Sequence, residues 1–134
     1  MRYMLDTNIC IYLLKRSSPS LLQRLVAHPP SDIYVSSITA AELSFGVMKS
    51  ERRRDNAHRL ELLLAEFGVA PFDDRAAEVY GAVRHALASG GEPIGPLDTL
   101  IAAHALALKA RLVTNNEREF RRVKGLHVEN WAAA

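Results

Sequence analysis

Short segments rich in β-branched and aromatic residues alternate with longer helical segments along nearly the whole chain. The expected strands are Arg2–Leu5, Ile33–Ser36, Val69–Phe72, Arg111–Thr114 and Leu126–Val128. Strands that are joined by crossover helices run parallel, because each helix returns the chain to the end of the sheet where the previous strand began. The alternation therefore predicts an α/β fold, a three-layer α/β/α domain with a mostly parallel central sheet of four to five strands.

The segments between these strands carry apolar periodicity and capping residues that are typical of helices. The expected helices are Ile9–Lys15, Leu21–Ala27, Ile38–Met48, Leu60–Phe67, Ala77–Leu87, Leu97–Lys109 and Asn115–Phe120. In the third helix, apolar residues recur at spacings of three and four, and we expect this face to be buried together with Glu42. Its members are Ile38, Ala41, Phe45 and Met48. Gly68 is expected to cap the end of the fourth helix.

The composition fits one domain over residues 1–134, since 49% of the residues are apolar and can form a core. The single cysteine, Cys10, excludes an internal disulfide and is consistent with a reducing compartment. We expect Cys10 to be a small buried residue and not a nucleophile. No signal peptide and no membrane-spanning segment are expected, so the prediction is a cytoplasmic protein. The net charge of +2 permits nucleic-acid binding without requiring it.

Three carboxylates lie in segments that should face the core. Asp6 follows the first strand, Glu42 lies in the third helix, and Asp98 lies in the first turn of the helix Leu97–Lys109. Ligands of open parallel sheets bind beyond the carboxyl ends of the strands, where these acids are expected to meet. Carboxylates close together in a partly dry site repel one another unless a cation joins them. The prediction is a site for Mg²⁺ or Mn²⁺, and with it phosphodiester chemistry.

Each of these acids also has a structural explanation. Asp6 is a good N-cap, and Asp98 lies where the helix dipole favours a negative charge. Glu42 could reach the surface through its flexible stem. Only the joint pattern favours the metal site.

Four segments carry a more specific pattern in a fixed order. They are Met4–Asn8, Ser36–Leu43 followed by Gly46, Ile94–Ala102, and Leu112–Phe120. Together they resemble PIN-domain proteins, and in particular the VapC toxins of bacterial VapBC toxin–antitoxin modules. The resemblance runs from about residue 2 to Trp131, and it implies a single PIN domain with magnesium-dependent endoribonuclease activity, in which Mn²⁺ may replace Mg²⁺.

The resemblance also assigns roles to the acids. Asp6, Glu42 and Asp98 match the family's three main acidic positions, which are catalytic and bind the metal. The family often has a fourth acid just after the last Thr-Asn, where this chain has Asn116. We expect Glu119 to supply the fourth catalytic carboxylate.

Glu117 is the alternative to Glu119, although we expect it to point to solvent. Asn116 itself could bind a metal through its amide oxygen, but without charge. In the family, Asn8 and Thr114 support the acids through hydrogen bonds.

Basic and aromatic side chains are candidate RNA contacts. The first choice is Arg118, Arg121 and Arg122, because they follow the last motif directly. Other basic clusters are Lys15–Arg16 and the run Lys49–Arg59. Aromatic residues that could stack on bases are Tyr12, Phe45 and Phe120, although at helical spacing such residues are more often in the core.

The resemblance further implies a VapB-like antitoxin, whose C-terminal segment lies in an apolar groove between the first helices and the basic helix. The expected groove residues are Tyr12, Leu13, Leu43 and Phe45. A homodimer formed through long helices is also implied. The predicted substrate is tRNA, cut in the anticodon loop, and contact with DNA is expected only through the antitoxin.

Two other functions remain open. One is a non-catalytic phospho-acceptor module with a receiver-like α/β fold, but such a domain has clustered acids near its N-terminus, where this chain has Asp6 alone. The other is a catalytically weak PIN-fold protein that acts with its antitoxin in DNA-linked autoregulation, and Asn116 favours it. Metal-dependent RNA cleavage distinguishes the ribonuclease from both.

Overall fold

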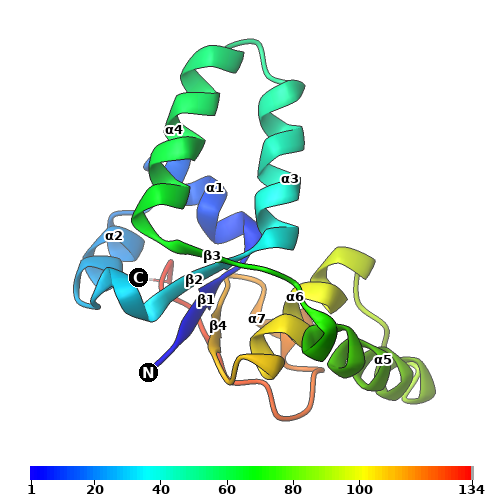
Figure 1. Cartoon of the computed structure of the whole chain (residues 1–134). Coiled ribbons are helices and arrows are strands. Elements are labelled where there is room, and N and C mark those ends of the chain that lie inside the picture. Colours follow the sequence, from blue (N-terminus) through cyan, green and yellow to red (C-terminus); the bar gives the residue numbers. More distant parts are fainter. Residues whose placement is uncertain (134) are drawn as a thin grey trace.

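The computed structural model describes residues 1–133 and contains a five-stranded sheet in the order β3–β2–β1–β4–β5 (Figure 1). The strands are β1 (Tyr3–Leu5), β2 (Ile33–Ser36), β3 (Gly68–Ala70), β4 (Arg111–Val113) and β5 (Val128–Glu129). All four neighbouring pairs are parallel. The predicted α/β fold with a parallel sheet is confirmed, and β1 and β4, which are remote in sequence, are neighbours in it.

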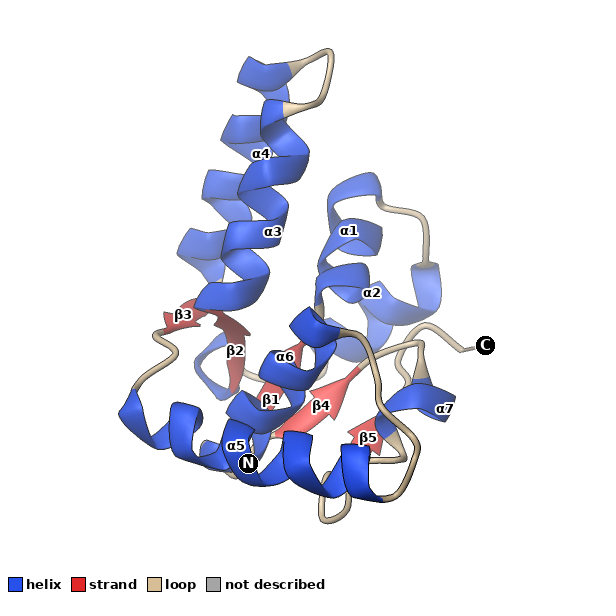
Figure 2. Cartoon of the chain, turned by 90° about the vertical axis from the view of Figure 1, so that its right-hand side faces the viewer, coloured by secondary structure: helices blue, strands red, loops and turns tan. Residues whose placement is uncertain are grey.

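Helices cover both faces of this sheet. They are α1 (Thr7–Lys15), α2 (Pro19–Val26), α3 (Ser37–Met48), α4 (Arg53–Glu66), α5 (Asp74–Ser89), α6 (Pro96–Ala107) and α7 (Glu117–Phe120), with a short 3-10 helix at Pro30–Asp32. Helices α1 to α4 lie on one side, and α5 and α6 lie on the other (Figures 1 and 2). Helices α3 and α4 form a hairpin that projects away from the sheet (Figure 1). Within residues 1–133, none of the helices has the length and hydropathy that crossing a bilayer requires.

The alternation of side chains along β1 divides the interior into two cores. Tyr3 and Leu5 point to the core beneath α1 to α4, whereas Met4 points to the core beneath α5 and α6. Cys10 is buried in the first core, as expected for a small apolar residue. Trp131, which is fully buried, packs on Tyr3 in the same core.

Polar side chains at strand ends begin several helices. Asp6 accepts a hydrogen bond from the Ile9 amide at 2.9 Å and thereby caps α1. Ser36 caps α3 in the same way, and Asp73 caps α5. Because Asp6 directly follows β1 and Ser36 ends β2, these two caps fix where α1 and α3 leave the carboxyl edge of the sheet.

The predicted buried face of α3 is wrong. Phe45 is 65% exposed and Met48 is 59% exposed, whereas Thr39 and Leu43 are buried. Helix α3 is apolar on most of its surface, so spacing alone does not identify the face that packs against α1 and α4. The predicted cap at Gly68 is also wrong, because Gly68 begins β3 and pairs with Tyr34 of β2.

Candidate active site

Side chains from four elements meet at the carboxyl edge of the sheet. Asp6 follows β1, and its amide donates to the Val113 carbonyl at the end of β4 (3.1 Å). An open pocket of about 780 Å³ lies here, and Asp6, Glu42 and Asp98 line it. The structure therefore brings together the three acids that the sequence pattern singled out.

Asp6 is a buried carboxylate with several hydrogen-bond donors. Only 3% of the residue is exposed. Burial, and to a lesser extent the negative charge of Glu42, raise the pKa of Asp6 to about 6, although hydrogen bonds from Thr114 and the Ile9 amide oppose this rise. Asp6 thus has the dual role of helix cap and pocket carboxylate, and the two explanations offered for it do not exclude each other.

Glu42 is held by a neighbour that sequence reasoning missed. The Thr7 hydroxyl donates to Oε1 of Glu42 at 2.7 Å and also lies 3.2 Å from the Thr39 hydroxyl. Thr7 is the first residue of α1, directly after Asp6, so the turn that positions Asp6 also orients Glu42. The position of Thr7 directly after Asp6 was the feature of the sequence that could have indicated this role.

Asp98 and Glu119 form the other side of the site. Burial, followed by the charges of Glu119, Asp6 and Glu42 in that order, raises the pKa of Asp98 to about 6. The Gly95 amide donates to Oε1 of Glu119 at 2.9 Å. A methyl group at Gly95 would lie 3.7 Å from Oδ2 of Asp98 and 3.9 Å from Oε1 of Glu119, so both carboxylates approach the same backbone position.

The geometry distinguishes among the candidates for the fourth position. The Asn116 side-chain amide donates to Glu119, which therefore lies beside the pocket that Asn116 lines. Glu117 instead accepts hydrogen bonds from Arg121 (2.7 Å) and Asn130 (3.1 Å). Glu119 is the carboxylate placed beside Asp98, and Asn116 orients it.

The two expected supporting residues differ in their surroundings. Thr114 is fully buried; its hydroxyl bonds to Asp6 and accepts from the Asn116 amide at 2.9 Å. Asn8 is exposed and lines the pocket. Thr114 therefore links β4, Asp6 and Asn116, whereas Asn8 contributes a polar side chain to the pocket rim.

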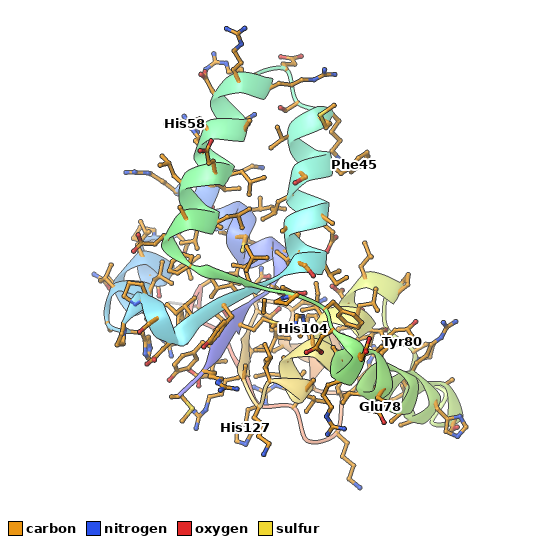
Figure 3. All side chains as sticks on the ribbon, in the orientation of Figure 1. Phe45, His58, Glu78, Tyr80, His104 and His127 are labelled. Atoms are coloured by element: carbon orange, nitrogen blue, oxygen red, sulfur yellow. The ribbon has the colours of Figure 1, made fainter. Side chains whose placement is uncertain are left out.

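A buried histidine connects the helices that carry Asp98 and Glu42. His104 of α6 is 1% exposed, and its Nδ1 lies 2.8 Å from the Ser36 hydroxyl, which also caps α3. The ring packs edge-on against Phe72 and points into the interior between α6 and the sheet (Figure 3). Burial lowers the pKa of His104, so the ring is neutral and able to accept from Ser36.

The predicted RNA-contacting arginines are exposed but lie outside the pocket lining. Arg121 forms an ion pair with Glu117 at 2.7 Å, and Arg122 donates to the Pro93 carbonyl at 3.2 Å. Arg118 is exposed on α7. Within residues 1–133, the cation that lines the acidic pocket is Lys49, which the sequence placed only within a longer basic run.

The three aromatic candidates for base stacking are not equivalent. Phe120 is 1% exposed and belongs to the core, so it is unable to stack on a ligand. The Tyr12 hydroxyl accepts from the Asn115 side chain at 2.6 Å, and its ring packs on the core. Phe45 is the remaining candidate for base stacking, because it is exposed and lines the acidic pocket.

A second pocket of about 400 Å³ lies between α1, α3 and α4. Its apolar side chains include Leu14, Leu43 and Val47, and its cationic ones are Lys15, Lys49 and Arg59. The groove predicted between the first helices and the basic helix therefore exists, with Leu43 in its lining. Tyr12, Leu13 and Phe45 were also expected there and are absent from its lining.

The donor set at the carboxyl edge fits a hard divalent cation. Its oxygen donors are the carboxylates of Asp6, Glu42, Asp98 and Glu119, and the raised pKa values of Asp6 and Asp98 include mutual repulsion that a cation would relieve. As placed, no three acidic, His or Cys side chains among residues 1–133 enclose an ion-sized space. Binding would therefore require small side-chain movements toward the ion.

Comparison with known proteins agrees with this geometry. The PIN domain family matches residues 3–126. Ribonuclease VapC2 of Rickettsia felis is 41% identical to the chain, and the aligned region covers 98% of both. The tRNA(fMet)-specific endonuclease VapC of Shigella flexneri is 39% identical over 98% of the chain and 99% of its own length. The crystal structure of DNA-bound VapBC from Salmonella typhimurium superposes with a TM-score of 0.93 at 37% identity, over 98% of both chains.

Proposed function

The chain belongs to the PIN domain family, and we propose that it is a VapC-type toxin that hydrolyses RNA with the help of a divalent metal ion. The observation that carries this proposal is the gathering of Asp6, Glu42, Asp98 and Glu119 at one edge of the sheet. A fold does not by itself imply an activity. The chemical argument for metal-assisted hydrolysis is that carboxylates from four separate elements converge at one place.

Each residue of the site has a definable task. Asp6, Glu42 and Asp98 would hold Mg²⁺ or Mn²⁺, and Glu119 would complete the anionic wall beside Asp98. When bound, such an ion acidifies water and stabilises negative charge that develops on a phosphate. Thr114 and Thr7 keep Asp6 and Glu42 in fixed orientations, and Gly95 and Asn116 do the same for Glu119.

The decisive experiment compares the purified protein with its Asp98→Asn variant on RNA. We expect cleavage by the wild type with Mg²⁺ or Mn²⁺, no cleavage with chelator, and a loss of about 100-fold or more in the variant, a loss typical of removing an essential electrostatic group. Asp98→Asn suits this test better than Asp6→Ala, because Asp6 also caps α1. Metal-independent cleavage, or full activity of the variant, would refute the assignment.

We propose tRNA as the substrate, cleaved in the anticodon loop, which places the activity in the cytoplasm. The support is the Shigella flexneri relative, which is named for its action on tRNA(fMet). Sequencing of RNA ends after brief expression, with Asp98→Asn as the control, would identify the cleaved RNA. Breaks confined to messenger or ribosomal RNA would exclude tRNA.

We further propose a VapB-like antitoxin as the partner, supported by the VapBC complex that the fold matches. The groove between α1, α3 and α4 is lined by apolar side chains and by three cations, so it fits a segment with apolar anchors and flanking acids. It shares Ile11, Glu42, Gly46 and Lys49 with the acidic pocket. A segment bound there would approach the site and obstruct it.

A DNA-linked role is a second candidate function and is compatible with the first. The Salmonella typhimurium relative was crystallised as VapBC bound to DNA. We expect DNA binding by this protein only in complex with its antitoxin. Mobility shifts on promoter DNA with the toxin alone, the antitoxin alone and the complex would test this expectation.

A further inference from the structure

Phe45 has an unusual position for an aromatic side chain. It is 65% exposed, and it is the only aromatic residue among the large exposed apolar side chains of residues 1–133. Figure 3 shows it on the outer side of α3, pointing away from α4. The ring therefore contributes little to the helix hairpin, and its apolar surface is available to a ligand.

The surroundings of Phe45 combine apolar surface with positive charge. The Lys49 ammonium lies 5.2 Å from the centre of the ring, one helical turn further along the chain. Both residues line the acidic pocket, and so does Leu97, which is 45% exposed on α6. An exposed aromatic ring with a cation over it thus stands at the mouth of the carboxylate site.

We propose that Phe45 stacks against a nucleobase of the RNA substrate while Lys49 contacts a phosphate of the same strand. This inference rests on the proposed ribonuclease function and names its substrate-binding residues. Unpaired nucleotides are recognised by aromatic stacking together with cationic contacts to the backbone.

Charge complementarity favours RNA over a protein as the occupant of this surface. Around the carboxylates, Lys49 supplies the positive charge that a phosphodiester needs to approach. The apolar groove suited to an antitoxin segment is lined by Leu43 and Val47; it shares Lys49 with the acidic pocket, but Phe45 is absent from its lining. A docked nucleotide therefore accounts for the exposed ring of Phe45, which a segment in that groove does not.

The test measures RNA binding without cleavage. The probe is a fluorescent stem-loop with the initiator-tRNA anticodon sequence, and binding is measured in chelator, where the proposed metal-dependent cleavage does not occur. We expect Phe45→Ala to weaken binding about tenfold or more, in line with the loss of one stacked base. Met48→Ala is the matched control, because Met48 is 59% exposed on the same helix but does not line the pocket, and it should bind like the wild type.

A tryptophan in place of Phe45 gives a direct signal of stacking. The chain has one native tryptophan, Trp131, and it is fully buried. In Phe45→Trp we expect wild-type affinity and quenching of the exposed indole on RNA addition, while the wild-type emission stays unchanged. Lys49→Ala should lower the slope of log affinity against log salt by about one, the signature of one lost phosphate contact.

Three results would overturn the inference. They are equal binding by Phe45→Ala and the wild type, unquenched indole emission from Phe45→Trp when RNA is bound, and conversion of a wild-type dimer to a monomer by Phe45→Ala in light scattering. The last result would make Phe45 a subunit contact. Absence of cleavage by the wild type refutes the ribonuclease, whereas cleavage that is insensitive to Phe45→Ala refutes only this substrate contact.

Discussion

At the scale of single residues, burial and neighbouring negative charges disfavour the ionised form of the acids in the site. The folded-state pKa of Asp98 is about 6, above its ordinary value of 3.8. A carboxyl with a raised pKa stabilises the folded state fully below pH 3.8, and this contribution is lost as the pH rises through about 6. At neutral pH the ionised group therefore opposes folding, and the proposed metal site gives a reason for its presence.

This argument predicts the stability of Asp98→Asn. Without metal, the variant should be more stable than the wild type at pH 8 by about 2 kcal/mol, which is the size of the pKa shift reduced for partial exposure of the carboxyl to solvent. The gain should shrink below about pH 6 and vanish near pH 4, where the wild-type carboxyl is protonated. Thermal unfolding of both proteins in chelator across this pH range is the measurement, and a gain that is constant with pH would contradict the electrostatic cause.

Ser36 makes two stabilising interactions, so its replacement should lower the free energy of unfolding through the loss of both. It caps α3 and bonds to buried His104, so Ser36→Ala removes a cap and leaves a ring nitrogen unpaired. We expect the free energy of unfolding, measured in urea, to fall by about 2–3 kcal/mol. Ser18→Ala is the control, because Ser18 only caps α2, and its loss should be about 1 kcal/mol. Equal losses would argue against the role of His104.

The sequence predicted the role of a residue correctly where that role depends on neighbouring residues in the chain. Asp6 follows a strand and precedes a helix, so its capping role and its place at the sheet edge follow from neighbouring residues. Phe120 was a candidate for stacking, although a core position was the more common expectation for such a residue, and the structure buries it. The choice of Glu119 over Glu117 was predicted, and the structure places Glu119 beside Asp98.

At the scale of elements, two glycines should respond in opposite ways to alanine. Gly81 lies within α5 with no atom within 4 Å of an added methyl group, whereas Gly125 has a φ of +84°, which favours glycine. We expect Gly81→Ala to stabilise the protein by about 0.5–1 kcal/mol and Gly125→Ala to destabilise it by about 1 kcal/mol. Urea unfolding checks both values, and Gly81→Ala should leave RNA cleavage unchanged.

Both element boundaries and element faces differ in places from those predicted. The N-terminus of α4 lies at Arg53, earlier than the predicted Leu60, because the basic stretch is itself helical. On α3, apolar residues occupy several sides, so helical spacing alone did not identify the packed face. Contacts with α1 and α4 select the side with Thr39 and Leu43, and they leave Phe45 and Met48 in solvent.

At the scale of the whole molecule, ion binding should be coupled to folding. The four carboxylates come from the end of β1 and from α3, α6 and α7, so they form one site only in the folded chain. An ion that binds only the folded state, at roughly ten times its Kd, stabilises that state by about 1.4 kcal/mol. We therefore expect Mg²⁺ or Mn²⁺ to raise the Tm at pH 8, and less so at pH 5, where protons compete for Asp6 and Asp98.

The controls for ion binding are two acid-to-amide substitutions. Asp98→Asn should abolish most of the rise in Tm, whereas Glu117→Gln should keep it, because Glu117 is tied to Arg121 away from the pocket. Calorimetric titration of the metal into each protein gives an independent measure. An equal Tm rise in both variants would place the ion elsewhere.

The sequence by itself determined the strands, the parallel sheet, the positions of the acids and the family pattern, because these depend on local propensity and on spacing along the chain. Only the tertiary structure decided which side of α3 is buried, that Thr7 holds Glu42, and that Lys49 rather than the C-terminal arginines lines the acidic pocket. Those features depend on distances between elements that are remote in sequence. Such distances are set by packing across the two cores, and no local pattern encodes them.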